Sequence, residues 1–270
     1  MINMSACNFF IVSNLEDSLR QQFQVIIFIR LDYNISMRVV SWNMRKNKKA
    51  WKYFFESLDP DIALLQESSP LDKDYPANII SKNVKTSLNN SILFKHNLPS
   101  ALPLEDQRNM GLIASQYQNE DENILLLSVY GNLSFTGELD YVLLKLIEDS
   151  IEAMRKNFNA TDIIISGDFN MDRRMDENPT SSKFSKKGET RHADFFDGIL
   201  NLGFHDCLRK FHSLPIQTYR HNRGTYPWEL DHMFVTDELY DRLKSISVFV
   251  DDHIIGLSDH NPIVADFEAQ

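Results

Sequence analysis

A carboxylate and an amide directly follow a strongly apolar, β-branched stretch of the chain. The stretch Ile163–Ser166 ends in Gly167, and Asp168 and Asn170 come next, two residues apart. In an extended backbone such a pair points to one side, so we expect both groups on one face at a strand's end. The carboxylate can take a proton or bind a hard cation, and the amide can orient a water or a phosphate oxygen, which suits phosphate-ester hydrolysis. An Asp-x-Asn turn that caps a buried strand is the alternative.

Further polar groups follow other predicted strands and could complete such a site. Glu67 ends the strand predicted for Ile62–Gln66, where it is either a rim charge or a metal ligand. Asp231 lies on the apolar face of another predicted strand, and a carboxylate there is costly without a partner. The imidazole of His260, at the start of the last predicted strand, could be that partner, next to Asp259.

Two more strand ends carry polar side chains. Asn43 follows the strand predicted for Met37–Trp42, and Tyr130 and Asn132 close the strand predicted for Ile124–Tyr130. Tyr130 could instead be a core tyrosine whose hydroxyl reaches water, which is the more frequent use of this residue.

Basic and aromatic residues cluster near these strand ends. Five positive charges follow Asn43, interleaved with aromatic residues at helical spacing, which predicts a helix with a basic N-terminal end. They are Arg45, Lys46, Lys48, Lys49 and Lys52. Together they could contact phosphate, although a solvated helix face is the alternative. The loop 173–191, which starts at Arg173, is long enough to be a substrate-facing flap. Residues 217–228 include Arg220, Arg223 and Trp228, which suit stacking on bases, or an ordinary hairpin with aromatic packing.

The segments between these groups have alternating strand and helix patterns. Leu139, Val142, Leu143 and Leu146 begin the apolar spacing of an amphipathic helix over residues 138–157. The other expected elements are paired strands at 111–116 and 124–130, short strands near 78–81 and 91–95, a helix at 192–202, strands at 204–208 and 229–236, and a closing strand at 263–267.

Composition sets the broad class. The 270 residues are 43% hydrophobic, enough for one large α/β domain or two small ones. Two cysteines provide neither a disulfide framework nor a cysteine-based zinc site. A net charge of -10 argues against a protein that coats nucleic acid by bulk electrostatics, but not against an enzyme with local basic patches.

The first 36 residues contain no recognisable site. We interpret residues 1–36 as an extension of unknown role and residues 37–270 as one catalytic domain. The longest apolar run near the start, residues 25–29, is far too short to span a bilayer. We therefore expect a cytoplasmic protein with no membrane association and no obligate protein partner.

Five motifs in order make the chain resemble the endonuclease/exonuclease/phosphatase superfamily, which includes abasic-site endonucleases, DNase I, neutral sphingomyelinases and inositol polyphosphate phosphatases. They are Ser-Trp-Asn, Pro-Asp-Ile-Ala-Leu-Leu-Gln-Glu, Gly-Asp-Phe-Asn, Leu-Asp-His and Ser-Asp-His-Asn-Pro, between residues 37 and 267. The resemblance implies a DNase I-like fold, a four-layer α/β sandwich of two packed mixed sheets flanked by helices, with the site at one edge.

The resemblance also implies roles for individual residues. Glu67 would hold a divalent cation, with Asn43 and Asp259 close by, and Asp168 would orient or deprotonate the attacking water. Asn170 would fix the phosphate or that water. His260 would stabilise the phosphoryl oxygen, with its tautomer set by Asp231. At Tyr130 and Asn132 the chain departs from the pattern, because the abasic-site enzymes have a longer Tyr-x-x-Asn spacing.

These ligands are oxygen atoms with no thiolate, so the expected cofactor is Mg²⁺ or Mn²⁺. The leading hypothesis is a metal-dependent nuclease that acts on DNA or RNA. A phosphatase or a lipid or small-molecule phosphodiesterase is the alternative, because the same central residues serve every member and only the rim selects the substrate. An inactive binding module is the third hypothesis, which the complete set of predicted catalytic residues argues against.

Overall fold

The computed structural model describes residues 35–73, 75, 77–85, 88–96, 100–102, 111–131, 139–177, 190–220 and 226–269. Asn132 and Arg223, two of the predicted substrate-binding residues, lie outside these ranges, as do most of the extension predicted for residues 1–36 and residues 178–189 of the predicted flap. The first described strand begins at Ile35, two residues before the predicted start of the catalytic domain.

The described strands are β1 (Ile35–Asn43), β2 (Ile62–Gln66), β3 (Asn78–Lys85), β4 (Leu88–Phe94), β5 (Ser100–Leu102), β6 (Gly111–Gln118), β7 (Asn123–Tyr130), β8 (Asp162–Asp168), β9 (His205–Asp206), β10 (Asp231–Val235), β11 (Leu243–Val248) and β12 (Ile263–Glu268). The helices are α1 (Ala50–Tyr53), a π-helical turn (Phe54–Leu58), α2 (Leu139–Asn157), a 3-10 turn (Arg173–Met175), α3 (Arg191–Asn201), α4 (Cys207–Phe211), α5 (Asp237–Arg242) and α6 (Asp252–Leu257). None of these helices has the length and apolarity needed to cross a bilayer.

The strands form two mixed sheets. One sheet has the order β11-β12-β1-β2-β4-β3, and the other has the order β5-β6-β7-β8-β10-β9. Each sheet has one parallel pair near its centre, β1 with β2 and β7 with β8. In each parallel pair, the carboxyl ends of the two strands therefore lie next to each other. These are the strand ends where polar residues follow apolar runs in the sequence.

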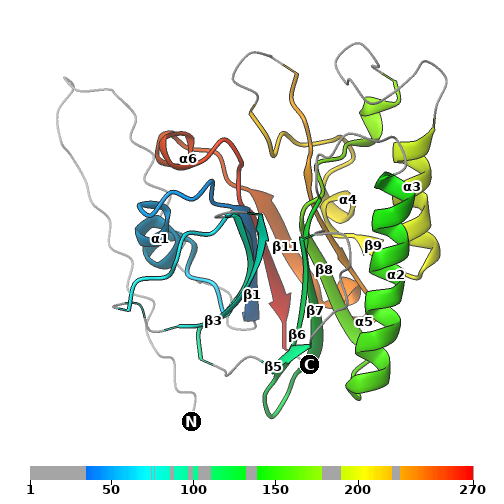
Figure 1. Ribbon diagram of the computed structural model, residues 1–270, viewed down its shortest axis with the longest axis horizontal. Helices are drawn as coiled ribbons and strands as arrows, with labels where there is room; N and C mark the ends of the chain where they lie inside the picture. Colours follow the sequence, from blue (N-terminus) through cyan, green and yellow to red (C-terminus); the bar gives the residue numbers. More distant parts are fainter. Residues whose placement is uncertain are drawn as a thin grey trace, which may run out of the picture. The chain divides into compact units, whose positions relative to one another are not determined.

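The two sheets pack face to face, and helices cover their outer faces. Apolar side chains from both sheets share one core, which includes Val39, Leu64, Leu126 and Ile164. On the outer faces, α2 and α3 cover the sheet that contains β8, and α1 and α6 cover the sheet that contains β1 (Figure 1). The predicted four-layer α/β sandwich is confirmed.

Strand alternation decides which residues reach the site. In β8, Ile164 faces the core between the sheets, whereas Ile163 and Ile165 face the helices. The same alternation directs Asp168 toward the space between the sheets, where β8 ends. Asn43 at the end of β1 and Asp231 at the start of the antiparallel β10 share this orientation, so three strands bring polar groups to one edge of the sandwich.

Two local predictions were wrong. The segment predicted as a strand at 204–208 contains only the two-residue β9 and then α4, because the Asp206 side chain accepts hydrogen bonds from the N–H groups of Leu208 and Arg209 and so starts a helix. The basic stretch after Asn43 is not one helix. Arg45 and Lys46 have φ values of 49° and 56°, and the helix begins only at Ala50.

Candidate active site

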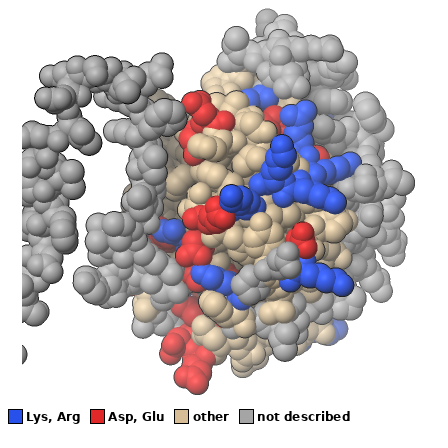
Figure 2. Space-filling model, turned by 90° about the vertical axis from the view of Figure 1, so that its left-hand side faces the viewer, with Lys and Arg blue, Asp and Glu red and all other residues tan. Residues whose placement is uncertain are grey.

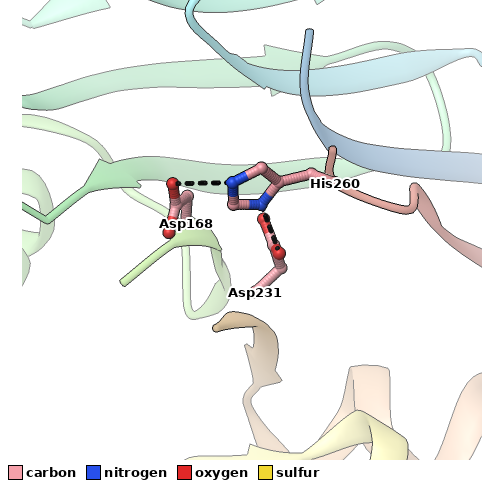
Figure 3. Close-up of side chains that lie close together, drawn as sticks. All are labelled: Asp168, Asp231 and His260. Atoms are coloured by element: carbon pink, nitrogen blue, oxygen red, sulfur yellow. Dashed lines mark hydrogen bonds and ion pairs between the residues drawn. The ribbon is translucent and has the colours of Figure 1, made fainter. Parts of the chain in front are cut away.

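An imidazole flanked by two buried carboxylates lies at the centre of the site. His260 Nδ1 lies 2.8 Å from Asp231 Oδ2, and its Nε2 lies 3.7 Å from Asp168 Oδ2 (Figure 3). All three residues are at most 5% exposed. The three come from β8, β10 and the loop before β12, so distant parts of the chain converge here.

Asp168 is held by hydrogen bonds to both of its carboxylate oxygens. Its Oδ2 accepts a hydrogen bond from Asn43 Nδ2 at 2.9 Å, and its Oδ1 accepts one from the backbone N–H of Asn170, also at 2.9 Å. Both polar atoms of the Asn43 amide form hydrogen bonds, because its oxygen also accepts one from the N–H of Arg45. Asn43 therefore links the two sheets at the site.

Burial and neighbouring charges shift the pKa values of Asp168 and His260. Burial raises the pKa of Asp168 to about 7, with His260 lowering it and Asp231 raising it. Burial would lower the pKa of His260, but the charges of Asp231 and Asp168 outweigh this and raise it to about 9. Near neutral pH, His260 is therefore an imidazolium, a donor at both nitrogens, next to a carboxylate that can gain or lose a proton.

Glu67 and Asp259 lie beside this group. The Tyr130 hydroxyl donates a hydrogen bond to Glu67 Oε1 at 2.7 Å. Burial raises the pKa of Tyr130, and the negative charges of Glu67, Asp168 and Asp259 add to this effect. The same three carboxylates also raise the pKa of Tyr219, after burial. Tyr130 lies opposite Asp168 in the strand pair β7–β8, and Arg45, whose N–H bonds the Asn43 side chain, pairs with Asp259, so the three carboxylates share one region.

The backbone around the site is held in rarely used conformations. Five described residues other than glycine have positive φ, and four of them belong to this region: Arg45, Lys46, Glu67 and Asn170. The φ of 54° at Asn170 also corrects the prediction that it extends the strand beside Asp168. Its side-chain amide turns back and donates to the carbonyl of Gly131 at 2.7 Å. Such strained residues persist only where surrounding contacts fix them.

Close backbone approach also fixes the end of β8. A Cβ atom on Gly131 would lie 2.1 Å from the carbonyl oxygen of Phe169, and one on Gly167 would lie 1.9 Å from that of Val129. Gly131 also donates its N–H to the carbonyl of Asp168 at 2.7 Å. Only glycine permits this approach, which fixes the backbone on either side of Asp168.

The donor chemistry of the site fits a hard divalent cation. The carboxylates of Glu67, Asp168 and Asp259 lie in one region, and burial raises the pKa of Asp168. Asp168, Asp231 and His260 each have one ligand atom within 4.8 Å of the others, but an imidazolium has no lone pair for a metal. Glu67 and Asp259, beside this group, add carboxylate oxygens, the ligand type that Mg²⁺ and Mn²⁺ prefer.

Two groups of predicted substrate-binding residues lie close to Asp259. Arg45 reaches Asp259 at 3.7 Å, and it is exposed, as are Lys46, Lys48, Lys49 and Lys52. The side of the molecule with α1 and α6 has Lys and Arg side chains gathered beside acidic ones (Figure 2). Arg220 donates its backbone N–H to the carbonyl of Asp259 at 2.8 Å, and its guanidinium donates to the carbonyl of Ser258.

Two other residues predicted to bind substrate, Arg173 and Trp228, interact with other residues of the protein. Arg173 pairs with Asp197 of α3 at 2.6 Å. Trp228 is 7% exposed, and its backbone pairs with Tyr219, which matches the hairpin with aromatic packing given above as the alternative. Their roles in substrate binding remain predictions.

Two buried hydroxyls that support the site were not identified from the sequence. Ser258 Oγ donates to the carbonyl of Asn43 at 2.7 Å and accepts the N–H of His260 at 3.0 Å. Thr218 Oγ1 accepts the N–H groups of Leu230 and Asp231. Ser258 is part of the Ser-Asp-His-Asn-Pro motif, which could have identified it, whereas nothing local marks Thr218, because its partners lie more than ten residues away.

Solved structures resemble this fold over most of the chain. A 3'-5' exonuclease (NExo) from Neisseria meningitidis has a TM-score of 0.65 and 20% identity, covering 86% of this chain and 100% of that one. An AP endonuclease from Archaeoglobus fulgidus has a TM-score of 0.65 and 19% identity, covering 86% and 99%. A variant of the 3' phosphatase NExo from Neisseria, bound to a product DNA hairpin, has a TM-score of 0.64 and 20% identity, covering 86% and 100%.

Sequence comparison identifies the family. No curated protein matches the chain by sequence. The Endonuclease/Exonuclease/phosphatase family matches residues 40–260, which contain the whole of the site from Asn43 to His260. The chain therefore belongs to the endonuclease/exonuclease/phosphatase family and is a phosphoester hydrolase of that family.

Proposed function

We propose that this protein is a divalent-metal-dependent phosphodiesterase that cleaves nucleic acid by attack of water on phosphorus. The observation that carries the proposal is the His260 ring held between Asp231 and Asp168, at 2.8 and 3.7 Å, beside the carboxylates of Glu67 and Asp259. This arrangement provides an acid, a base and oxygen ligands in one place.

Asp168 is the proposed base. A group whose pKa lies near 7 can accept a proton from water at neutral pH, and both of its oxygens are oriented by hydrogen bonds from Asn43 and Asn170. The water oxygen bonds to phosphorus as its proton passes to Asp168. The ester oxygen then leaves with the electron pair of the broken P–O bond and takes a proton from solvent.

His260 is the proposed electrophile. Its Nδ1–H bond is held by Asp231, which leaves Nε2–H directed toward Asp168 and the space where a phosphoryl oxygen would gain charge. A buried charged donor at that position stabilises the transition state more than the ground state. Asp231 is thus an orienting residue, and it compensates the positive charge that His260 carries.

Glu67 and Asp259 are the proposed ligands of Mg²⁺ or Mn²⁺, with Tyr130 orienting Glu67 through its 2.7 Å hydrogen bond. When bound, the ion would neutralise the phosphate oxygens and polarise the phosphorus centre. Asn43 already bonds Asp168 through its nitrogen, so we assign it chiefly to orienting the base.

Nucleic acid is the favoured substrate. The exposed cations Arg45, Lys46, Lys48, Lys49 and Lys52 follow the strand that ends at Asn43. The similar structures named above are described as an exonuclease, an AP endonuclease and a 3' phosphatase bound to DNA. A phosphatase or small-molecule phosphodiesterase is the second candidate, because the net charge of -10 opposes polyanion binding away from that patch.

A substrate panel tests the proposal. Purified protein with Mg²⁺ is incubated with plasmid, single-stranded DNA, abasic duplex, a 3'-phosphate duplex, RNA and a chromogenic phosphodiester, with and without chelator. We expect cleavage of at least one nucleic acid, lost with chelator and in Glu67→Gln. Cleavage of the chromogenic diester alone would support the small-substrate alternative. Full activity in chelator would contradict metal dependence. His205→Gln is the control, because the His205 side chain is 43% exposed and pairs with Asp237 away from the site.

A further inference from the structure

A second cluster of ligand-type side chains lies outside the active site, around the other face of β10. Asp206, Glu229 and His232 each have one potential ligand atom within 4.8 Å of the others. The side chains of His232 and Glu229 are 5% and 7% exposed. The mechanism proposed above uses none of these three residues.

His232 has an unused lone pair inside this cluster. Its Nε2 lies 2.9 Å from the carbonyl oxygen of Met171, and since a carbonyl can only accept, the ring proton is on Nε2. Nδ1 is therefore an acceptor in the neutral ring. It is buried, it has no hydrogen-bond partner among the described residues, and it lies 3.9 Å from Glu229 Oε1. When the ring is neutral, Nδ1 and Glu229 Oε1 are two buried acceptors that face each other, which is unfavourable unless a proton, a donor or a metal cation lies between them.

One oxygen of each carboxylate, in Asp206 and in Glu229, is held by hydrogen bonds. Asp206 Oδ1 accepts from the backbone N–H of Leu208 at 2.9 Å and from that of Arg209 at 3.3 Å. Glu229 Oε2 accepts from Ile216 N–H at 2.5 Å and from the Arg209 guanidinium at 2.6 Å. Oε1 of Glu229 stays directed toward His232. A metal-binding histidine usually donates its other nitrogen to a carbonyl in the same way as His232 does to Met171.

The charge balance of the cluster is compatible with a bound cation. Two carboxylates carry about two negative charges, and the Arg209 guanidinium, 2.6 Å from Glu229 and 3.7 Å from Asp206, offsets one of them. Arg209 pairs with Oε2 of Glu229, so it leaves Oε1 and the imidazole lone pair available.

This cluster is distinct from the active site. Asp231 and His232 are consecutive in β10, so their side chains point to opposite faces of the sheet. The His232 ring packs against Phe169 and Phe196, in the apolar layer beneath α3, with ring centroids at 5.5 and 4.6 Å. An ion bound there would reach no catalytic side chain directly.

We propose that Asp206, Glu229 and His232 form a structural site for a divalent transition metal, best matched by Zn²⁺. One imidazole nitrogen and two carboxylate oxygens are a donor set that Zn²⁺ accepts, with water as a fourth ligand. The ion would join β9, the start of α4 and β10, and so stabilise the strand that carries Asp231.

Calorimetric titration with Zn²⁺ tests the site in the full-length chain. Glu67→Gln is the background, because it weakens the catalytic metal site. After chelator treatment and dialysis, we expect one Zn²⁺ to bind, with an affinity that falls at least about tenfold in Glu67→Gln/Glu229→Gln and in Glu67→Gln/His232→Phe. His205→Gln in the same background is the matched control and should bind as the background does. Equal affinity in all four proteins would overturn the proposal.

A second measurement separates metal binding from folding. With Zn²⁺ about 100-fold above its Kd, the Glu67→Gln protein should gain roughly 5–8 °C in Tm, and its Glu229→Gln derivative should gain almost nothing. Circular dichroism checks that both are folded without metal. With Co²⁺ as the probe, the visible spectrum should show nitrogen ligation that His232→Phe removes and His260→Gln keeps. A nitrogen signature lost only in His260→Gln would place the ion at the active site and contradict the proposal.

Discussion

At the scale of single residues, different surroundings give Asp168 and His260 different pKa values and so the roles of base and acid. Asp168 and His260 face each other at 3.7 Å, yet the first has a pKa raised to about 7 by burial and the second a pKa raised to about 9 by its neighbouring carboxylates. Between these values both groups are in the charge state that the proposed reaction needs, a carboxylate and an imidazolium. Asp231 makes this possible because it compensates the buried positive charge.

We predict that kcat/KM depends on pH in a bell shape. Activity should rise as Asp168 loses its proton near or below pH 7, since a bound cation would lower that pKa, and fall as His260 loses its proton near pH 9. His260→Gln should reduce the rate by about 10² to 10⁴ and remove the alkaline limb. The measurement is the pH–rate profile of each variant on the best substrate. An alkaline limb that persists in His260→Gln would assign it to another group.

We also predict that the metal-free protein loses stability as pH rises. The folded pKa of His260 is about 9 against 6.5 unfolded, so its stabilisation is complete below pH 6.5 and lost as pH rises through 9. The raised pKa of Asp168 acts in the same direction, from about pH 4 to 7. Urea unfolding between pH 6.5 and 9 should show a falling free energy of unfolding, on the order of 1–3 kcal/mol. His260→Gln should flatten this slope, and an unchanged slope would contradict the assignment.

At the scale of elements, the end of β8 positions the catalytic carboxylate. Its backbone passes so close to β7 that Gly167, with φ of 151°, leaves no space for a Cβ. Gly131 likewise leaves no space for a Cβ, because the backbone of Phe169 lies against it, and Asn170 donates a hydrogen bond to the Gly131 carbonyl. The side chain of Asp168 is thus fixed by strand packing before any substrate or ion arrives.

We predict that Gly167→Ala lowers the free energy of unfolding by about 3 kcal/mol or more, because backbone must move to relieve a 1.9 Å contact. Gly256→Ala in α6 is the control. A Cβ there meets no described residue within 4 Å, so stability should stay the same or rise by about 0.5–1 kcal/mol. Chemical denaturation of both variants measures the difference. Equal stabilities would mean that the contact between β7 and β8 relaxes freely.

At the scale of the whole molecule, charge is unevenly placed. The net charge is -10, yet five exposed cations are concentrated in residues 45–52, just after the end of β1. Arg45 joins this patch to the site through its 3.7 Å pair with Asp259. A polyanion would therefore be attracted to this patch, against the negative net charge of the whole chain.

We predict that Lys48→Ala/Lys49→Ala/Lys52→Ala weakens nucleic-acid binding and reduces its salt dependence. For duplex DNA, the slope of log K against log salt should shrink by about 0.9 for each lost phosphate contact. KM for a small diester should not change. Lys145→Ala is the control, since Lys145 is an exposed lysine on α2 that pairs with Asp149. If the triple variant and Lys145→Ala bind DNA equally well at every salt concentration, the patch does not contact substrate.

Much of the architecture could be predicted because its signals are local. The apolar strand runs of β1, β2, β7, β8 and β12 and the amphipathic helix α2 carry their periodicity in the sequence, and the five ordered motifs pointed to the four-layer sandwich. The segment 204–208 was misassigned because a side-chain cap at Asp206 outweighs its strand-like pattern. Likewise β11 and α6 were not predicted, since their short patterns are weak.

The sequence by itself determined the family, the sandwich and the identities of the polar groups at its strand ends, because residue types and their order are local information. Tertiary structure decided how those groups interact. Only packing of the two sheets brings Asn43 to within 2.9 Å of Asp168, although the two residues are 125 positions apart. Only the folded chain brings Asp231 and Asp168 next to His260, where their charges raise its pKa to about 9 against the opposing effect of burial. Solvation and charge depend on every neighbour in space, and no stretch of sequence contains that information.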